Sequence, residues 1–239
     1  MNILITGASK GIGRSIALEF AKNGHNIIGC SKSDFDSLKE SEHIIKSMGV
    51  DCYTALCDVS NEDSVKEFIF YASKKIKTID VLVNNAGISH IGLIQDMSLD
   101  EWNNIINTNL TSAFLMSKYI IPKMIARQSG HIINISSVWG NIGASMETAY
   151  STSKGGLNAF TKALSKELAP SGISVNAIAP GFIDTTMNAS FSRDELESIF
   201  NEIPMGRSGK AEEVAELAYK IATSKYITGQ VITIDGGWT

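Results

Sequence analysis

The sequence predicts an α/β fold in which a doubly wound, mostly parallel sheet of about seven strands carries helices on both faces. Short apolar runs alternate with longer stretches of helical periodicity over all 239 residues. The strand candidates are followed by polar or glycine-rich segments, and the first one leads into a glycine loop and a helix. Together these features are typical of a Rossmann-type sheet, expected here as a single domain over residues 1–239.

Local signals predict the elements of the first half of the chain. Residues 2–6 form an apolar run expected to be the first strand, and residues 12–24 carry an apolar stripe that ends at a glycine. A capping-type residue, Ser33 or Asp34, marks the start of the next helix. Acidic residues come early and lysines late in a further helix, which matches the helix dipole. The remaining strands are expected at 25–31, 50–59 and 79–87, and the helices at 33–49, 60–77 and 98–125.

The second half continues the same alternation. Strands are expected at 130–137, 172–180 and 229–237, and helices at 148–168 and 210–223. Strand–helix–strand units of this kind make successive strands parallel.

The composition of the chain narrows the possible functions. A net charge of −4 with no basic block makes nucleic-acid binding unexpected. The three cysteines form no C-x-x-C pair, which favours a reducing compartment. The N-terminal apolar run is too short for a signal peptide, and no run approaches ~18 apolar residues. We therefore expect a cytoplasmic protein, and the four histidines show no spacing typical of a metal site.

The segment TGASKGIG at residues 6–13 has the features of a phosphate-binding loop. Gly7 allows a tight turn, Gly11 lets the backbone approach a pyrophosphate, and Gly13 allows a helix to pack closely on a strand. The helix that follows offers N–H groups and a partial positive charge to a phosphate. The spacing G-x-x-x-G-x-G differs from the G-x-G-x-x-G of ordinary dinucleotide-binding dehydrogenases. The other loop residues expected at the cofactor are Ser9, Lys10 and Ile12.

A tyrosine and a lysine four residues apart, Tyr150 and Lys154, lie in the helix expected at 148–168. Four residues make about one helical turn, so the two side chains share one face of the helix. The spacing alone fits either a solvated surface contact or a proton donor tuned by a neighbouring cation.

Six motifs in order resemble the short-chain dehydrogenase/reductase family over essentially the whole chain. They are the glycine loop, N-N-A-G at 84–87, Asn109 in INTNL, Ser137 in ISS, the Tyr150–Lys154 pair, and the P-G of NAIAPGFIDT. The resemblance implies an oxidoreductase that transfers a hydride between a nicotinamide cofactor and a carbonyl carbon. It implies that residues up to about 135 bind the cofactor, that residues from about 136 bind the substrate, and that residues of about 184–206 form a partly helical lid. It also favours the proton-donor interpretation of the tyrosine–lysine pair.

The resemblance implies catalytic roles for four residues. Tyr150 is expected to protonate the carbonyl oxygen as the hydride arrives. Lys154 is expected to hold the nicotinamide ribose and to lower the pKa of the phenol. Ser137, thirteen residues before the tyrosine, is expected to polarise the carbonyl, while adjacent Ser136 is structural. Asn109 is expected to hold a water in a proton relay to the lysine.

The end of the second strand predicts the choice of cofactor. It reads CSKS, with Ser31 and Lys32, and the first acidic residue is Asp34. Enzymes that prefer NAD carry an acidic residue here, which binds the ribose 2′-hydroxyl. Its absence, with Lys10 and Lys32 available to neutralise a 2′-phosphate, predicts NADPH. The further cofactor contacts that the resemblance implies are Asp58, Val59, Asn85, Ala86, Gly87, Pro180, Gly181 and Ile183.

Three apolar residues are candidates to line the substrate pocket. Trp139 and Met146 lie between the serine and the tyrosine of the catalytic set, and Met187 lies in the expected lid. Ordinary apolar packing explains each of them equally well.

Within the family, the pattern is most similar to bacterial 3-oxoacyl-acyl-carrier-protein reductases, which implies a β-keto thioester substrate and a homotetramer. Those reductases dock the acidic carrier with two arginines, and the matching positions here are Gln128 and Ser171, with Arg127 adjacent. The segments SSVWGNIGASMETAYSTSK, TTMN and DGGWT are instead similar to reductases of a 5-oxopentanoyl-type (aminopentanone) adduct on a lysine of elongation factor P. Both substrates stay open here. A catalytically inactive, nucleotide-binding regulatory protein is a third interpretation, which the intact catalytic set opposes.

Overall fold

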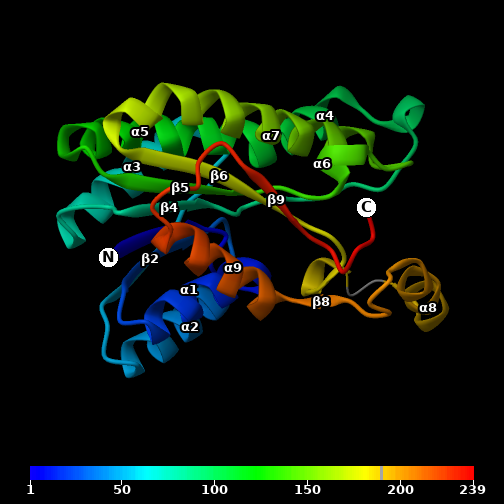
Figure 1. Cartoon of the computed structure of the whole chain (residues 1–239), viewed down its shortest axis with the longest axis horizontal. Coiled ribbons are helices and arrows are strands. Elements are labelled where there is room, and N and C mark those ends of the chain that lie inside the picture. Colours follow the sequence, from blue (N-terminus) through cyan, green and yellow to red (C-terminus); the bar gives the residue numbers. More distant parts are fainter. Residues whose placement is uncertain (189–190) are drawn as a thin grey trace.

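The structure of the chain, a computed structural model, describes residues 1–188 and 191–239, except for the side chain of Met187. Seven parallel strands form one sheet in the order β3-β2-β1-β4-β5-β6-β9 (Figure 1). The predicted α/β fold is therefore confirmed. The strands are β1 Asn2–Thr6, β2 Asn26–Ser31, β3 Cys52–Leu56, β4 Val81–Asn84, β5 Gly130–Ile135, β6 Ile173–Pro180 and β9 Val231–Ile234.

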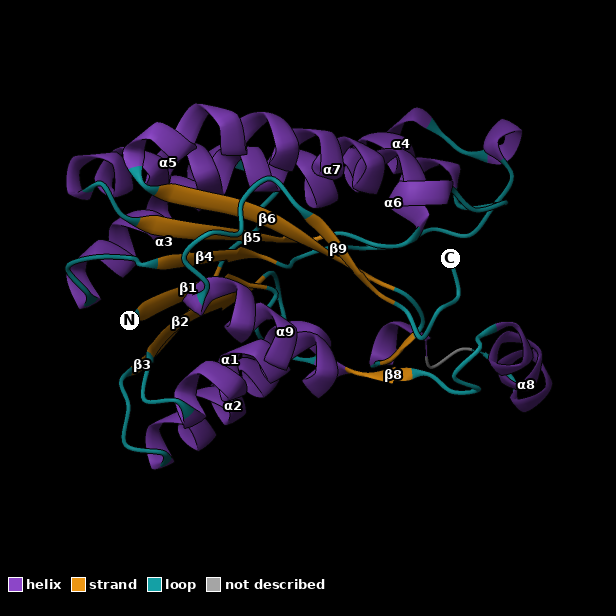
Figure 2. Cartoon of the chain, in the orientation of Figure 1, coloured by secondary structure: helices purple, strands orange, loops and turns teal. Residues whose placement is uncertain are grey.

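Helices cover both faces of this sheet (Figure 2). One face packs against α1, α2 and α9, and the other against α3, α5 and α7. The helices are α1 Gly11–Lys22, α2 Phe35–Ser47, α3 Glu62–Lys75, α4 Leu99–Ile106, α5 Ser112–Arg127, α6 Trp139–Ile142, α7 Thr148–Leu168, α8 Arg193–Glu202 and α9 Ala211–Thr223. Short 3₁₀ turns lie at Ile94–Asp96, Ala169–Ser171 and Thr186–Asn188.

The strand sequences are apolar on both sides because both faces of the sheet are buried. In β1, Ile3 and Ile5 enter the hydrophobic cluster beneath α1 and α9, whereas Leu4 enters the cluster beneath α3 and α5. Helix α2 begins after Asp34, whose carboxylate accepts a hydrogen bond from the Ser37 N–H at 3.4 Å. Asp34, rather than Ser33, is therefore the cap.

Two features of the fold differ from the expectation, and a helix is present within 184–206, where a partly helical segment was expected. The single helix expected at 98–125 is interrupted by a π-helical segment, η2 Asn107–Thr111, between α4 and α5. A second, two-stranded parallel sheet pairs β7 Ile183–Asp184 with β8 Gly209–Lys210. The expected lid region contains a capped helix, α8, whose Ser192 hydroxyl accepts from the Glu195 N–H at 3.4 Å.

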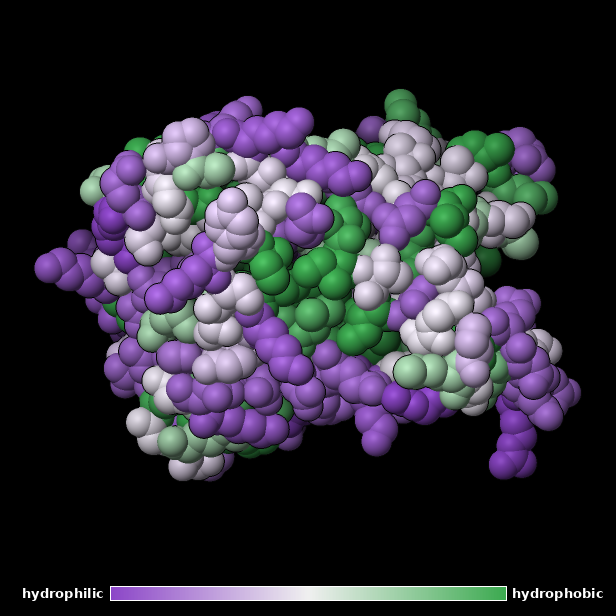
Figure 3. Space-filling model, in the orientation of Figure 1, coloured by the Kyte–Doolittle hydropathy of each residue, from purple (hydrophilic) through white to green (hydrophobic). Residues whose placement is uncertain are grey.

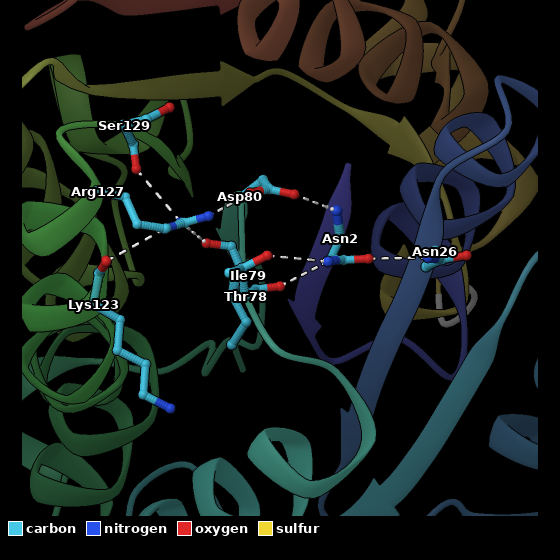
Figure 4. A network of polar contacts seen from close by, with 8 residues as sticks. All are labelled: Asn2, Asn26, Thr78, Ile79, Asp80, Lys123, Arg127 and Ser129. Atoms are coloured by element: carbon cyan, nitrogen blue, oxygen red, sulfur yellow. Dashed lines mark hydrogen bonds and ion pairs between the residues drawn. The ribbon is translucent and has the colours of Figure 1, made fainter.

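A polar network ties the amino-terminal ends of the central strands to α5 (Figure 4). The Arg127 guanidinium contacts an Asp80 carboxylate oxygen at 2.7 Å and donates to the Ile79 carbonyl at 2.7 Å. The other oxygen of Asp80 accepts from the Asn2 N–H at 2.8 Å, and the Asn2 side chain accepts from Asn26 at 3.0 Å. These contacts hold α5 and the starts of β1, β2 and β4 together.

None of the helices in the described residues combines the length and the apolar character that a bilayer crossing requires.

Candidate active site

Hydrogen bonds join the loop after β1 to the loop after β4, at the carboxyl ends of these neighbouring strands. The Thr6 hydroxyl accepts hydrogen bonds from the N–H groups of Asn85 and Ala86, both at 3.0 Å. The Asn85 side chain donates in return to the carbonyls of Thr6 at 2.9 Å and Gly7 at 3.1 Å. The strand order reverses between these two strands, which is where α/β sheets bind dinucleotides.

The amino terminus of α1 fits a phosphate group. The Lys10 side chain does not cap this helix, and within the described residues no side chain accepts from its first N–H groups. Gly7 has a φ of 68°, which favours glycine, and a Cβ on Gly13 would lie 2.2 Å from the Gly7 carbonyl oxygen. The loop therefore keeps the close backbone approach that a pyrophosphate needs. Of the other loop residues, Ser9 is buried, Ile12 packs against the core and Lys10 is exposed.

Two lysines flank the ends of β2 and β3, and each faces an acidic residue. Lys32 Nζ lies 2.8 Å from an Asp58 carboxylate oxygen, and Lys10 Nζ lies 3.9 Å from Asp34. Burial raises the pKa of Asp58, but hydrogen bonds from Lys32 and Ser60 outweigh it and hold that pKa below its usual value. Of the other residues expected here, buried Ser31 donates its hydroxyl to the Asp34 carbonyl at 3.1 Å, and the Val59 side chain enters the core.

Asn109 is buried inside the π-helical segment and clamps the loop after β4. Its amide oxygen accepts from the Ile88 N–H at 2.8 Å, and its amide nitrogen donates to the Ile88 carbonyl at 2.9 Å. The same nitrogen donates to the Ser153 hydroxyl at 3.0 Å. The wider turn of a π-helix is a frequent device at functional sites. A Cβ on Gly87 would lie 3.3 Å from the Asn109 amide oxygen and 3.4 Å from Lys154 Nζ, so these groups converge.

Lys154 is fully enclosed, with 4% of its surface exposed. Its ammonium donates to the Ile135 carbonyl at the end of β5, at 2.8 Å. It lies 5.6 Å from the centre of the Tyr150 ring. Burial lowers the pKa of Lys154 to about 8. The buried lysine therefore loses its proton closer to neutral pH than an ordinary lysine does.

The expected lowering of the Tyr150 pKa by Lys154 is wrong for this structure. Burial raises the pKa of Tyr150 to about 12, a hydrogen bond with Ser137 works against the rise, and the negative charge of Glu147 adds to it. The reason is geometric. The lysine ammonium is directed to the Ile135 carbonyl, and the desolvation of the phenol dominates.

The two serines after β5 have different hydrogen-bond partners. Ser137 is buried beside the phenol, and its hydroxyl accepts from the Trp139 N–H at 3.2 Å. The Ser136 hydroxyl instead donates to the Lys154 carbonyl at 3.3 Å, away from the tyrosine.

The loop after β6 closes the site on the far side. The Pro180 carbonyl accepts from the Val138 N–H at 3.0 Å, and the Gly181 N–H donates to the Ile234 carbonyl at 2.9 Å. The Ile183 side chain is buried in the core near α9, so only its backbone is available to a cofactor.

The residues expected to line the substrate pocket differ in their burial. Trp139 is half-buried and packs against Trp238, with ring centroids 4.8 Å apart. Met146 is exposed and has a φ of 63°, an unusual value for a side-chain-bearing residue. The side chain of Met187 lies outside the part of the chain that the structure describes.

Sequence reasoning missed two residues of this site. Ser153 is completely buried, accepts from Asn109 and donates to the Tyr150 carbonyl at 2.7 Å. Its place three residues after the tyrosine, on the same helical face, could have indicated it. Trp238 lies almost at the C-terminus, and nothing in its local sequence predicts its contact with Trp139.

Known proteins share this fold. A crystal structure of a short-chain type dehydrogenase/reductase from Mycobacterium marinum matches with a TM-score of 0.94 and 34% identity, over all of this chain and 95% of that one. A family model described as enoyl-(acyl carrier protein) reductase matches residues 7–239. The chain belongs to the short-chain dehydrogenase/reductase family. It is accordingly an oxidoreductase that acts on carbonyl or hydroxyl groups.

Curated relatives in this family match over nearly their whole length. The 3-oxoacyl-[acyl-carrier-protein] reductase of Thermotoga maritima is 43% identical, over 98% of this chain and 96% of the relative. An uncharacterized oxidoreductase of Bacillus subtilis is 39% identical, over 98% of this chain and 97% of the relative. The 3-oxoacyl-[acyl-carrier-protein] reductase of Pseudomonas aeruginosa is also 39% identical, over 98% of this chain and 95% of the relative.

The burial of Lys154 predicts a measurable effect of pH on stability. An unfolded lysine keeps its proton up to a pKa of ~10.4, whereas the folded one loses it near pH 8. The unfolded chain therefore binds more protons between these pH values, so stability rises with pH in that window. We expect wild type to gain on the order of 2 kcal/mol relative to Lys154→Met between pH 7 and pH 10.

Urea unfolding of both proteins at each pH measures this gain, and Lys162→Met, on the exposed side of α7, is the matched control. Parallel pH profiles for wild type and Lys154→Met would mean that the buried lysine keeps its ordinary pKa.

Proposed function

We propose that this chain is an NADPH-dependent ketone reductase, which reduces the β-keto group of a 3-oxoacyl thioester to a hydroxyl. The observation that carries the proposal is the convergence of Tyr150, Ser137 and Lys154 at the carboxyl ends of the strands, with Lys154 next to the loop that carries Gly87. The curated relatives that are named as 3-oxoacyl-[acyl-carrier-protein] reductases support the class of substrate.

The proposed chemistry follows from the electrostatics of the site. When bound, the nicotinamide cofactor supplies the hydride. The Ser137 hydroxyl polarises the carbonyl, and the Tyr150 O–H donates a proton to the oxygen as negative charge develops on it. A pKa of about 12 keeps the phenol protonated at neutral pH, which is the form that a reduction requires. Lys154 holds positive charge beneath the site, and Asn109 fixes the loop that carries Gly87.

The cofactor-holding residues follow the same edge of the sheet. The free N–H groups of α1 receive the pyrophosphate, and the loops after β3 and β4 line the adenine and ribose. In this proposal, residues up to about 135 hold the cofactor, later residues hold the ketone, and 184–206 cover it within a single domain. The backbone after Pro180 bounds the nicotinamide side.

The preference for NADPH rests on the two lysines. Lys32 and Lys10 have 64% and 60% of their side chains exposed, so both can turn toward a 2′-phosphate. Their contacts with Asp58 and Asp34 are surface ion pairs, which contribute little to stability and can be exchanged for a dianion at small cost. No acidic side chain takes the position at the end of β2 that binds a 2′-hydroxyl in NAD enzymes.

Removal of the Lys32 charge is expected to weaken NADPH binding selectively. For Lys32→Ala we expect the Kd of NADPH to rise about tenfold, with the Kd of NADH unchanged, because only NADPH carries the 2′-phosphate. Fluorescence titration of both cofactors measures the two constants, and Lys66→Ala on α3 is the control. Equal weakening of both cofactors would contradict this role.

The general-acid role is tested by removal of one hydroxyl. For Tyr150→Phe we expect turnover of acetoacetyl-coenzyme A with NADPH to fall about 10²–10⁴-fold, because the proton donor is lost. Unfolding midpoint and NADPH affinity should stay close to wild type. The control is Tyr71→Phe, because the Tyr71 hydroxyl donates to the Thr54 carbonyl away from the site. Turnover retained within about threefold would rule out the role.

A second candidate substrate is a ketone carried on another protein, namely the 5-oxopentanoyl-type (aminopentanone) adduct on elongation factor P. Gln128 and Ser171 stand where the carrier-protein reductases have docking arginines, and both lie at the amino-terminal edge of the sheet. Arg127 was expected to offer a substitute charge, but Asp80 and the Ile79 carbonyl hold its guanidinium (Figure 4). The Arg127 guanidinium is therefore engaged within the chain and does not replace the docking arginines.

Salt dependence separates the two substrates. If an acyl-carrier protein is the partner, we expect its acetoacetyl thioester to be reduced much faster than the coenzyme A thioester at low salt, with the advantage lost at high salt. Steady-state NADPH oxidation at two salt concentrations measures this. Equal and feeble rates on both thioesters would favour the modified elongation factor. An inactive regulatory protein would bind NADPH and turn over neither of them.

We also propose that the chain assembles as a homotetramer in the cytoplasm. Figure 3 shows an apolar patch over the edge strand β9 and helix α9, where Ile232, Ile234 and Leu217 are only partly buried. An uncovered apolar face on an edge strand is typical of an interface between subunits. Light scattering of the purified chain tests the assembly.

A further inference from the structure

We propose that Trp238 is a specificity-determining residue of the substrate site, and that residues 235–239 form a strap that joins α8 to α6. The inference rests on the proposed function, because it assumes that a ketone is reduced beside Ser137. Figure 1 shows the C-terminus between the labels of α6 and α8, on the side of the molecule where β6 and β9 end.

The strap reaches the catalytic segment through a pair of indole rings. The rings of Trp238 and Trp139 have centroids 4.8 Å apart and planes inclined at 60°. The backbone N–H of Trp139 donates to the Ser137 hydroxyl at 3.2 Å. Trp139, which contacts Trp238, is therefore hydrogen-bonded to the residue that we propose to polarise the carbonyl. Nearly one hundred residues of sequence separate the two tryptophans, yet they form one aromatic surface.

The strap is held in place by its own polar contacts. The Asp235 carboxylate accepts from the N–H groups of Gly237 at 2.9 Å and Thr239 at 2.8 Å, and from the Thr239 hydroxyl at 2.9 Å. These bonds fold the last residues back on themselves. Burial raises the pKa of Asp235, but the same hydrogen bonds outweigh it and hold that pKa below its usual value.

The second end of the strap is the lid helix. The Trp238 indole N–H donates to a carboxylate oxygen of Glu202, the last residue of α8, at 3.3 Å. The Met205 N–H donates to the Gly236 carbonyl at 3.2 Å, which adds a backbone contact between the lid and the strap. One side chain thus contacts both the lid and the wall beside Ser137. A tryptophan with one apolar face and one hydrogen-bonded edge suits such a boundary.

The chemistry of this wall defines the ketone that it favours. In this proposal, the two inclined indoles form a rigid apolar surface against which an unbranched alkyl group beside the carbonyl packs, and a branched group is disfavoured. The substrate class is therefore a ketone with an unbranched alkyl group beside the reacting carbon. Loss of the Trp238 ring should weaken binding of the ketone with the unbranched alkyl group and allow the ketone with the branched group to bind.

The kinetic test compares acetoacetyl-coenzyme A with 4-methyl-3-oxopentanoyl-coenzyme A, whose ketone bears a branched group. For Trp238→Ala we expect the KM for acetoacetyl-coenzyme A to rise about tenfold with kcat within about threefold. The ratio of kcat/KM values should shift at least tenfold toward the branched ketone. Trp238→Phe should keep most of the wild-type preference, and the Kd of NADPH should not change.

Unchanged kinetics on both ketones would overturn the proposal, as would an equal loss on both ketones together with loss of NADPH binding. Tyr226→Ala is the control, because Tyr226 is an aromatic side chain that is fully exposed.

A spectroscopic test is independent of turnover. The chain has three tryptophans, and two rings at this separation couple to give an exciton signal in circular dichroism. Trp139→Phe and Trp238→Phe should each abolish the same signal, while Trp102→Phe leaves it. 3-Hydroxybutyryl-coenzyme A added to the NADP-bound protein should change the signal more than NADP alone does.

The two tests separate the two proposals. If wild type reduces no 3-oxo thioester, the proposed function fails, while loss of the signal in both variants still supports the strap. If wild type reduces the thioester and the signal is absent or survives in Trp238→Phe, the proposed function stands and the strap is wrong.

Discussion

The parallel pairing of all seven strands is the constraint on which the position of the candidate site depends. Because each of the seven strands ends at the same edge, segments from distant parts of the chain meet there. The Thr6 hydroxyl fixes the central pair of these ends by accepting two N–H groups of the neighbouring loop. At the opposite ends of the strands, the Arg127–Asp80–Asn2 network links α5 to β1 through the residue that precedes β4.

Helix α7 brings Tyr150 and Lys154 to that edge, and burial sets the pKa values of both side chains. The enclosed lysine carries a charge that the interior opposes, and one carbonyl hydrogen bond offsets only part of the cost. The enclosed phenol is held in its protonated form. Asn109 and Ser153 connect this helix to the loop after β4. The site thus combines two groups that are costly to bury with a rigid frame that keeps them in place.

The sequence predicted the parts of the fold that depend on local pattern. The helix at 148–168 and the first strand were placed with the bounds that the structure shows, and the strand ends do meet at one edge. The π-helical segment at Asn107–Thr111 was missed because a change in hydrogen-bond ring leaves the residue pattern helical. The raised pKa of Tyr150 and the Trp139–Trp238 contact depend on burial and on distant residues, which local patterns do not encode.

The central claim, hydride transfer to a ketone, is tested most directly with NADPH that carries deuterium at both C4 positions. The purified chain is given an equimolar mixture of a 3-oxoacyl and a 2-enoyl thioester, and the products are analysed by mass spectrometry and NMR. Our account predicts a 3-hydroxyacyl thioester with one deuterium on the carbon that bears the hydroxyl. A labelled saturated thioester with the ketone untouched, or no label in either product, would contradict it.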